Sequence, residues 1–583
     1  MTMDRRKFIQ MGAYLYATAP LIACKTGGEL GKSEILQSAS NSRLRVRPSV
    51  FSEEGANMLV VYEQVVAEMK KYDESDDRIA ISEKIILGGV QENFVEDSDV
   101  GKWTSWLGQA VVHLKYCPHG NWYFLPWHRA YLFYFEQICR DVAAGLSERK
   151  VADKYYENFA VPYWDWTHEK NLPKIFFRSG SALNVSEDKT IGRIRPWPRL
   201  LKSGDENAVS KRQAQVFGKE SVSPLYDIVN FFDFASYPAQ GIRDNARGGQ
   251  GFLEGSPHNM GHNAVGGIMG SMLSPYDPIF WTHHCNVDRI WSQWMMERLN
   301  RKDTSIALPS DLQEKDLRFL AKDYFTGPSK SGSASPMEGF FGLSGQTESI
   351  SVEDTIGLHF VYNINYEDSG TKDHEIDFVD AFSKSNANPA QLNLSDSIAT
   401  VSSLPLSVSK SQNVLSFSLS TETTSSDVRR QNAAIQQKLR SYLAVASRNS
   451  YKHDIKLHVS GILPPFDSEP GFEGVMNDKN RSIYLSFELR MLGGQRRELG
   501  KVSFFGQEHL LRRKHSSHAH HAKGLNVSFD IKNDVLKHGQ KLFGNEKSSL
   551  YITVYDLKGN LVRNVDPSVF RGVELGLDFT TFV

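Results

Sequence analysis

Histidine is distributed very unevenly along this chain, and that distribution constrains the protein more than any other feature of its sequence. None of the 18 histidines lies before residue 113, and seven of them fall in two short stretches, 113–128 and 258–284. Random placement in a chain of 583 residues does not produce two such clusters. The two stretches are therefore the first places to look for chemistry.

The first stretch combines three imidazoles with a thiol. Its candidate ligands are His113, Cys117, His119 and His128, and the last of these lies in the aromatic string Phe124-Leu125-Pro126-Trp127-His128-Arg129. A single histidine in an apolar helix is more often a core residue with satisfied hydrogen bonds. Several histidines at short spacing among aromatic side chains favour a metal site instead.

The second stretch has the spacing of a helix face. His258 and His262 are four residues apart, so both project from one face of a helix and can reach one metal ion. The segment Asp277-Pro278-Ile279-Phe280-Trp281 then leads towards the tandem His283-His284. Each of the two stretches therefore offers a set of three histidines.

The types of ligand indicate the kind of metal. Neutral imidazoles suit copper, zinc, iron and nickel, whereas magnesium and calcium prefer oxygen ligands. Acidic residues are nearly absent from both stretches, which argues against magnesium and calcium. The same absence argues against a binuclear zinc hydrolase, because such sites normally contain bridging carboxylates. Two three-histidine sets imply two late transition-metal ions.

The composition is that of a soluble globular protein with several domains. Lys and Arg total 67 and Asp and Glu total 68, so the formal charge is −1, and 40% of the residues are hydrophobic. The balanced charge gives no compositional case for a nucleic-acid partner. Four cysteines in so long a chain cannot form the dense disulfide framework of a small secreted scaffold.

The N-terminus resembles a bacterial export signal. Arg5 and Arg6 precede an apolar stretch, residues 9–23, that is too short to span a bilayer comfortably. The stretch leads into Leu21-Ile22-Ala23-Cys24, which is similar to a lipobox, where Cys24 would be acylated after cleavage. This predicts export from a bacterial cytoplasm by the twin-arginine route, as a periplasmic protein or as a lipoprotein tethered to the membrane. The alternative is an ordinary N-terminal helix.

Shifts in pattern divide the rest of the chain. Apolar residues recur at helical spacing from about residue 51, a polar linker follows the helical part, and alternating strand patterns come last. The expected organisation is a signal with a lipobox at 1–24, a flexible tether at 25–50, a mainly helical metal domain at 51–367, a linker at 368–400 and a C-terminal β-sandwich at 401–583, which one helix over 432–447 interrupts.

Several motifs resemble those of the tyrosinase, catechol oxidase and molluscan haemocyanin superfamily. They are the string around His128, Pro162-Tyr163-Trp164-Asp165-Trp166, the His258 and His262 pair, the segment that leads to His284, and Val361-Tyr362-Asn363-Ile364-Asn365-Tyr366. The resemblance extends to about residue 367. It implies a four-helix-bundle core with a type-3 dicopper site, in which three histidines hold each of two copper ions.

The same resemblance implies which histidines would bind which ion. The first copper would take His113, His119 and His128, and the second would take His258, His262 and His284. In the family the second histidine of the tandem is the ligand, so His283 would pack beside the site. Only five residues separate His113 from His119, fewer than in most members, but no histidine upstream could replace His113.

Two further pairs acquire roles from the resemblance. Cys117 and His119 match a Cys-x-His arrangement that carries a thioether in some members, and the alternative is a plain buried thiol. Glu254 and Asn259 resemble the pair thought to hold a deprotonating water in members that hydroxylate monophenols. The alternative is a solvated loop carboxylate and a polar helix residue.

Other residues would support the site rather than react. Phe280 would pack against a ligand ring, and Arg129 and Asp288 would orient helices through buried pairing. Where plant members place a bulky gate, this chain has Ser271 and Met272, which suggests a more open entrance.

The resemblance therefore implies an exported dicopper oxidase that converts o-diphenols, and also monophenols, to o-quinones with dioxygen. The alternatives are a haemocyanin-like dioxygen-binding protein and an o-aminophenol oxidase. The C-terminal domain would either shield the active site or serve as a stabilising or partner-binding module. The histidine-rich tract with His515, His518, His520 and His521 would either assist copper loading or form a surface loop. The sequence does not indicate an oligomeric state.

Overall fold

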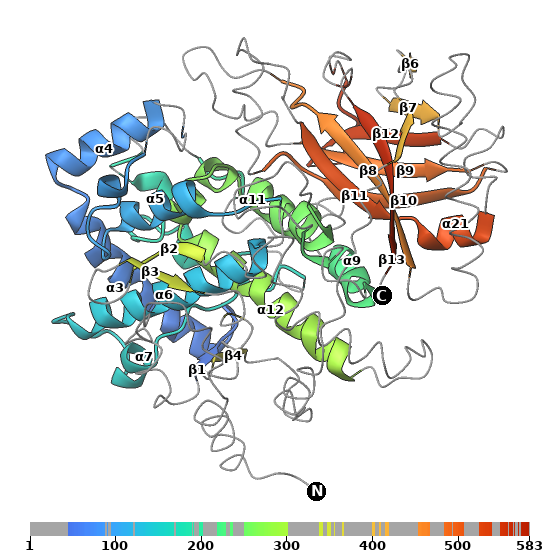
Figure 1. Ribbon diagram of the computed structural model, residues 1–583. Helices are drawn as coiled ribbons and strands as arrows, with labels where there is room; N and C mark the ends of the chain where they lie inside the picture. Colours follow the sequence, from blue (N-terminus) through green and yellow to red (C-terminus); the bar gives the residue numbers. More distant parts are fainter. Residues whose placement is uncertain are drawn as a thin grey trace, which may run out of the picture.

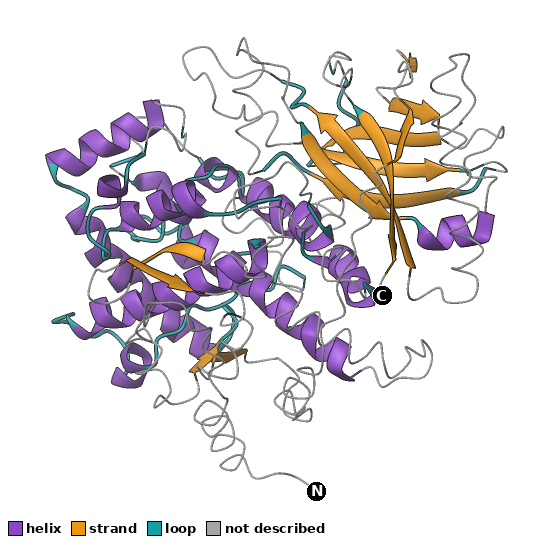
Figure 2. Ribbon diagram, viewed as in Figure 1, coloured by secondary structure: helices purple, strands orange, loops and turns teal. Residues whose placement is uncertain are grey.

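The computed structural model places most helices on one side of the molecule and most strands on the other (Figures 1 and 2). The described residues lie within 45–191, 198–300, 337–366, 399–418 and 453–581, with shorter gaps inside these ranges. The expected signal, residues 25–44 of the tether, residues 367–398, the helix over 432–447 and the tract 515–521 lie outside the described residues. Among the helices that are described, none is both long and apolar enough to cross a bilayer.

Helices dominate the N-terminal half, as the apolar spacing predicts. The long helices are α3 (Glu53–Tyr72), α4 (Asp76–Leu87), α5 (Trp106–Tyr116), α6 (Phe124–Ala144) and α12 (Ile279–Asn300). Shorter ones are α7 (Asp153–Glu157), α9 (Lys219–Val222) and α11 (Asn259–Val265), the last of which follows a π-helical turn, η6 (Glu254–His258). The 3-10 turns are η2 (Asp97–Val100), η3 (Lys174–Phe176), η4 (Val185–Glu187), η5 (Ser223–Asp227), η7 (Gly267–Gly270) and η8 (Ser274–Tyr276).

Helix α6 lies at the centre of the helical core. Its residues are buried on almost every side, which is the pattern of a helix surrounded by other elements. The ring of Phe135 in α6 stacks on Trp281 of α12 with centroids 3.4 Å apart. Tyr62 of α3 lies 6.4 Å from the rings of both Phe135 and Trp106. Aromatic packing therefore joins α3, α5, α6 and α12.

A buried charge network fastens the chain before α3 to this core. Arg47 donates to Glu136 of α6 at 2.8 Å and to Asp288 of α12 at 2.9 Å. Asp288 also accepts from Arg129 at 2.6 Å and from the hydroxyl of Tyr366 at 2.6 Å. The expected tether over 25–50 is therefore too long at its C-terminal end, because buried ion pairs hold Arg47 in the domain.

Two short strand pairs lie beside the helices. Strand β1 (Arg45–Arg47) runs parallel to β4 (Ile364–Tyr366), with Arg47 opposite Tyr366. Strand β2 (Met337–Phe341) runs antiparallel to β3 (Thr347–Ile350). Two strands far apart in the sequence therefore close the helical domain at the charge network.

The C-terminal region is built from antiparallel sheets, as its alternating pattern predicts. The five-stranded sheet has the order β10-β9-β12-β7-β6 and the four-stranded sheet the order β11-β8-β13-β5. The strands are β5 (Ala399–Ser402), β6 (Ser407–Ser409), β7 (Val414–Ser418), β8 (His453–Ile462), β9 (Ile483–Arg490), β10 (Arg496–Val502), β11 (Leu525–Asp530), β12 (Ser549–Asp556) and β13 (Glu574–Thr581), with helix α21 (Lys532–His538) after β11. Side chains of both sheets, such as Leu457 of β8 and Phe487 of β9, share one apolar cluster.

Strand β10 lies against the segment that carries the second histidine stretch. Gly500 of β10 leaves room for the ring of Phe529 in β11, from which a Cβ would lie only 2.9 Å away, and the ring of Phe252 lies on the same side at 3.4 Å. Next to it, Gln250 forms an isolated bridge with Val527 of β11. After β10 the chain turns towards the histidines. The C-terminal region thus reaches the candidate site directly.

Candidate metal centre

Six buried histidines meet where α5, α6, α11 and α12 come together. The first set is His113 in the last turn of α5, His119 in the loop after it and His128 near the start of α6. The second set is His258 at the end of η6, His262 in α11 and His284 in α12. Each of the six is at most 4% exposed. The structure therefore brings together the histidines of both sequence stretches.

The ring nitrogens of the second set converge on one point. Nε2 of His262 lies 3.1 Å from Nε2 of His258 and 3.1 Å from Nε2 of His284, and the remaining pair is 3.3 Å apart. Nitrogens bound tetrahedrally to one ion at about 2.0–2.1 Å lie roughly 3.3 Å from one another. The second set therefore has the spacing that a single metal ion requires.

Hydrogen bonds at the other ring nitrogen decide which nitrogen faces that point. Nδ1 of His262 lies 2.9 Å from the carbonyl oxygen of Met269, and Nδ1 of His258 lies 2.8 Å from Oδ1 of Asn259. An amide oxygen only accepts, so Nδ1 donates and Nε2 presents a lone pair. Lone pairs that face each other across 3.1 Å repel unless a cation lies between them. The arrangement fits a bound metal.

Two rings of the first set are held in the same way. Nδ1 of His113 lies 2.8 Å from the carbonyl oxygen of Met272, and Nδ1 of His128 lies 2.8 Å from that of Phe124. Nε2 of His113 is buried without a hydrogen-bond partner among the described residues. One ligand atom from each first-set histidine and Sγ of Cys117 all lie within 4.8 Å of one another. A buried unpaired nitrogen is costly, so a metal ligand is the role it suits.

His283 lies beside the second set, but both of its nitrogens are already engaged. Nδ1 accepts from Nε1 of Trp166 at 3.1 Å, and Nε2 donates to the carbonyl oxygen of His258 at 3.1 Å. Its ring reaches within 4.8 Å of the ligand atoms of His258 and His262. Metal binding would break one of those hydrogen bonds, whereas Nε2 of His284 already points at the other two ligand nitrogens. The geometry favours His284 as the third ligand.

The two sets are neighbours, and an aromatic side chain supports both. The rings of His128 and His284 stack with centroids 4.2 Å apart, so one ring of each set lies against the other. Phe280 of α12 packs on His284 at 4.1 Å and on His113 at 5.1 Å. The stacking brings two candidate metal positions into one enclosed site.

Burial keeps five of these imidazoles neutral. Loss of solvation lowers the pKa of His113 to about 3, and it holds the pKa values of His128, His258, His262 and His284 well below the usual 6.5. Neighbouring imidazoles depress the last four further. Neutral imidazole is the form that binds metal, so these rings need not lose a proton near neutral pH.

Cys117 lies among the first-set rings. Its Sγ is 3.6 Å from Nδ1 and 3.9 Å from Nε2 of His119, the two nitrogens that flank ring carbon Cε1, and 3.3 Å from Nε2 of His128. Burial raises the pKa of this thiol well above its ordinary value, and the carboxyl of Glu254 raises it further. The sulfur is therefore a protonated thiol close to the ring of His119.

Glu254 is buried beside the site rather than solvated in a loop. One carboxyl oxygen accepts from the backbone N–H of Gly120 at 2.7 Å, and the other accepts from the hydroxyl of Ser236. Desolvation raises the pKa of Glu254 to about 8, although both hydrogen bonds lower it. Asn259 lies in α11, and its Nδ2 is buried without a partner among the described residues. Sequence reasoning missed Ser236, which no local pattern connects with Glu254.

The segment expected to form an open gate supports a first-set ring. Ser271 is fully buried, and its hydroxyl donates to the carbonyl oxygen of Ile268 at 2.9 Å. Met272 offers its carbonyl oxygen to His113. The backbone of this segment thus orients a first-set ring, and the more open entrance at Ser271 and Met272 stays a prediction.

A phenylalanine from the C-terminal region covers the histidines. The ring of Phe505, just after β10, stacks on His262 with centroids 3.9 Å apart and planes 17° apart. It also lies 5.6 Å from the ring of His258 and 5.5 Å from that of His119, and it is 1% exposed. Sequence reasoning missed Phe505, since nothing in its neighbourhood distinguishes it from other aromatic residues near a strand end.

Comparison with known proteins agrees with this geometry. Residues 99–297 match the model of the common central domain of tyrosinase. The tyrosinase HcTyr1 of Hahella sp. strain CCB-MM4 is 32% identical over 195 residues, which cover 31% of this chain and 38% of that protein. The tyrosinase of Streptomyces glaucescens is 27% identical over 241 residues, 39% of this chain and 75% of that protein. A functional unit of octopus hemocyanin aligns with 92% of this chain at 15% identity and a TM-score of 0.39.

The matched residues contain all six histidines described above. Proteins of this family use two copper ions, and the two histidine clusters fit two metal sites. The chain matches little more than a third of the length of the Hahella protein, so the likeness lies in the central domain. Residues 99–297 therefore contain a central domain of the tyrosinase family of type-3 copper proteins.

Proposed function

We propose that this protein is a dicopper oxidase that oxidises o-diphenols to o-quinones with dioxygen. The main support is the meeting of six buried imidazoles in two adjacent sets. In this proposal His113, His119 and His128 hold one copper ion, and His258, His262 and His284 hold the other. When bound, the two ions supply the two-electron redox chemistry that dioxygen and a diphenol require.

The surrounding residues set the conditions for that chemistry. The carbonyl oxygens of Met269, Met272 and Phe124 hold three of the rings at Nδ1, so the ligands keep their orientation when the charge of the site changes. The ring of Phe280 packs against both sets and excludes water from one side. Neutral imidazole ligands keep the charge of the site low, which favours reversible changes of oxidation state in a buried site.

Glu254 and Asn259 are the proposed base and its partner when the substrate is a monophenol. A phenol has a pKa of about 10 and must lose its proton before its oxygen can bind a metal. The pKa of Glu254 is raised to about 8, so its ionised form is a stronger base than an ordinary carboxylate. The unpaired Nδ2 of Asn259 can hold the water or the phenol oxygen involved.

The C-terminal region is proposed to be a β-sandwich that shields the active site. The support is the position of Phe505, which covers His262 and contacts one ring of each set. A phenol ring that approached the second set would need the same space. The intact chain is therefore expected to be latent, and an o-diphenol gains access when this side chain is removed or displaced.

Oxygen uptake by the copper-loaded protein without residues 1–24 tests both ideas. A catechol and its matching monophenol are compared before and after limited proteolysis within 368–400. Uptake with catechol that rises on cleavage is the expected result, and uptake with monophenol implicates Glu254 and Asn259. A protein that holds two coppers, binds dioxygen reversibly and turns over neither substrate would overturn the oxidase in favour of an oxygen carrier.

A neighbouring pair of phenylalanines provides a matched control for the shield. Phe505→Ala removes the ring over the histidines, whereas Phe504→Ala removes a fully buried ring that belongs to the apolar cluster of the sheets. The first variant should oxidise catechol without proteolysis, and the second should remain latent. Equal activation of both variants would mean that general loosening of the C-terminal region, not an emptied site, admits substrate.

We also propose export of the protein by the twin-arginine route with lipid attachment at Cys24. The support is the order of Arg5, Arg6, the apolar stretch and Cys24 in the sequence. Cys24→Ser should move the protein from the membrane fraction to the soluble fraction of its host. Replacement of both arginines by lysine should leave it in the cytoplasm, and an unchanged distribution in both variants would contradict export by this route.

A further inference from the structure

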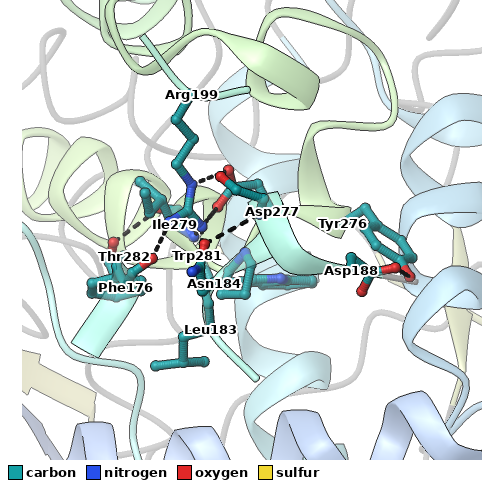
Figure 3. A network of polar contacts seen from close by, with 12 residues as sticks. Phe176, Leu183, Asn184, Asp188, Arg199, Tyr276, Asp277, Ile279, Trp281 and Thr282 are labelled. Carbon is teal, nitrogen blue, oxygen red and sulfur yellow. Dashed lines mark hydrogen bonds and ion pairs between the residues drawn. The ribbon is translucent and has the colours of Figure 1, made fainter. Parts of the chain in front are cut away.

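A buried arginine and aspartate hold the start of the helix that carries His284. Oδ1 of Asp277 accepts from the backbone N–H of Ile279, the first residue of α12, at 2.9 Å. Arg199 binds the same carboxylate twice, from Nε at 2.8 Å and from Nη2 at 2.6 Å (Figure 3). Its guanidinium also donates to the carbonyl oxygens of Phe176 and Leu183. One side chain therefore ties a loop and a helix start together.

The start of the helix that carries His113 is built from the same parts. Oδ2 of Asp73 accepts from the backbone N–H of Leu107 in the first turn of α5 at 2.7 Å. Arg78 binds that carboxylate from Nε at 3.2 Å. Its Nη1 and Nη2 donate to the carbonyl oxygens of Asp99 at 2.6 Å and Val100 at 3.3 Å. The arginine again joins a capping aspartate to two backbone carbonyls.

These two groups are called here the α12 clamp, Arg199 with Asp277, and the α5 clamp, Arg78 with Asp73. All four side chains are at most 6% exposed, so water does not compete for their hydrogen bonds. A guanidinium has enough fixed donors to serve a carboxylate and two carbonyls at once, and an ammonium group cannot reproduce that geometry. The clamps are therefore specific for arginine.

Each clamp is close along its helix to one ligand. His284 follows Ile279 by five residues and His113 follows Leu107 by six, which corresponds to about 8–9 Å at a rise of 1.5 Å per residue. A hydrogen-bonded helix transmits a shift of its first turn to side chains one to two turns away. Displacement of the clamp would therefore displace the ligand ring of that set.

We propose that Arg78 and Arg199 are positioning residues, each of which sets the metal affinity of one histidine set through the start of its ligand helix. The α5 clamp acts on the first set and the α12 clamp on the second. The clamps concern metal ligands, so the inference rests on the two-metal site proposed above. It adds that each set has a positioning residue of its own, outside the ligand rings.

Variants that retain a single set make the proposal measurable. His262→Ala leaves the first set complete, and His119→Ala leaves the second set complete. In each background the dissociation constant for Cu(I) is measured by competition with a chelator, and the visible spectrum of bound Co(II) reports the ligand geometry. Arg78→Lys and Arg199→Lys are then introduced separately into both backgrounds.

The expected result is a crossed pattern. Arg199→Lys should weaken Cu(I) binding about 10–100-fold and change the Co(II) spectrum in the second-set background, the loss typical of outer supports of a metal site. It should change binding by a smaller factor in the first-set background, because α12 reaches that set through packing, such as Phe280 on His113, and not through a ligand. Arg78→Lys should do the reverse. A purely structural role would weaken both sets together and would not separate them.

Two controls guard against misfolding. The double variant Arg199→Met with Asp277→Asn removes the charge pair as a unit, so it leaves no buried unpaired carboxylate and should show the same second-set loss. Arg149→Met breaks the exposed ion pair with Asp153 and should change neither affinity. All dissociation constants are measured at a temperature at which the far-ultraviolet circular dichroism spectrum of each variant equals that of the parent.

The outcomes separate this inference from the proposed function. Suppose that the parent protein binds two ions, but that the arginine variants weaken binding equally in both backgrounds or in neither. This result would contradict the role of the clamps and leave the two-metal site intact. A parent protein that binds no metal ion would overturn both. Crossed loss in the two backgrounds, repeated in the double variant, would support independent positioning of the two sets.

Discussion

The two histidine sets are built in different ways. All second-set histidines lie in helical segments, and their Nε2 atoms are 3.1 to 3.3 Å apart. In the first set His119 lies in a loop, and the thiol of Cys117 lies among the rings, 3.3 Å from Nε2 of His128. The second set is thus arranged for an ion in advance, whereas the first contains a loop ligand and a sulfur.

The difference shows how one site can combine rigid and adjustable ligands. Helical ligands keep their spacing because backbone hydrogen bonds fix it, and a loop ligand depends on its contacts with other elements. Here the contact comes from Glu254, which lies just before His258 in η6 and accepts from Gly120 next to His119. The rigid set therefore supports the loop of the other.

The largest effect is expected from the tandem histidines of the rigid set. His284→Ala should lose one metal ion and lower the turnover of catechol by more than about a thousandfold, since a metal supplies several kcal/mol in such reactions. His283→Ala should keep both ions, because its nitrogens bind Trp166 and the backbone of His258. The metal content of the two purified variants decides which histidine is the ligand. Loss of one ion in His283→Ala but not in His284→Ala would reverse the assignment.

The next largest effect is expected in the Cu(I) affinities of the two sets, which decide the order in which the sets bind metal. The second set should bind Cu(I) at least about tenfold more tightly than the first, because less ordering of side chains accompanies binding to a preformed site. Chelator competition in His119→Ala and His262→Ala, which each keep one complete set, measures both constants. Equal affinities would show that the loop and the thiol of the first set impose no penalty on metal binding.

Residue spacing predicted positions within a single helix or strand, but it did not predict contacts between residues far apart in the sequence. The four-residue spacing of His258 and His262 placed both on one helical segment, and spacing alone was enough for that. By contrast, Phe505 reaches His262 from more than two hundred residues away, and Arg47 joins Asp288 from nearly as far. Periodicity reports which residues share a face but not which distant residue covers that face, so the shield and the charge network required the fold.

Glu254, which connects the two sets, should make stability depend on pH. In the folded metal-free protein its pKa is about 8, against an ordinary value of 4.5 in the unfolded chain. Between these values the folded state holds a proton that the unfolded state has lost, so rising pH favours unfolding. From pH 7 to 8 the free energy of unfolding should fall by about 1 kcal/mol from this group alone.

Urea unfolding of the metal-free protein at pH 7, 8 and 9 tests this expectation. Glu254→Gln keeps a similar shape without a titratable carboxyl group, so its free energy of unfolding relative to that of the parent should rise by about 1 kcal/mol from pH 7 to 8. Histidines with lowered pKa values also make stability depend on pH, because about a quarter of each is protonated in the unfolded chain at pH 7, but they act equally in the parent and the variant. A parent and a variant with parallel pH profiles would contradict a raised pKa at Glu254.

The smallest effect is expected at the sulfur that distinguishes the first set. If dioxygen, acting on the copper-loaded protein, removes the thiol hydrogen of Cys117 and a ring hydrogen of His119 and so joins Sγ to a ring carbon, the peptide that contains both should be lighter by two hydrogens and resistant to alkylation. Cys117→Ser should then weaken Cu(I) binding to the first set about two- to tenfold, since one more ring must be ordered on binding. The second set should be unchanged.

Cys139 provides the matched control for this sulfur. It is a fully buried thiol in α6, and no histidine lies among the groups that shift its pKa, so Cys139→Ser should affect neither set. Loss of affinity at both sets in Cys117→Ser would mean that the residue acts through packing of the whole site. A fully active, copper-loaded protein whose Cys117 still reacts with alkylating reagents would exclude the thioether, and the flexibility of the first set would then rest on the loop that carries His119.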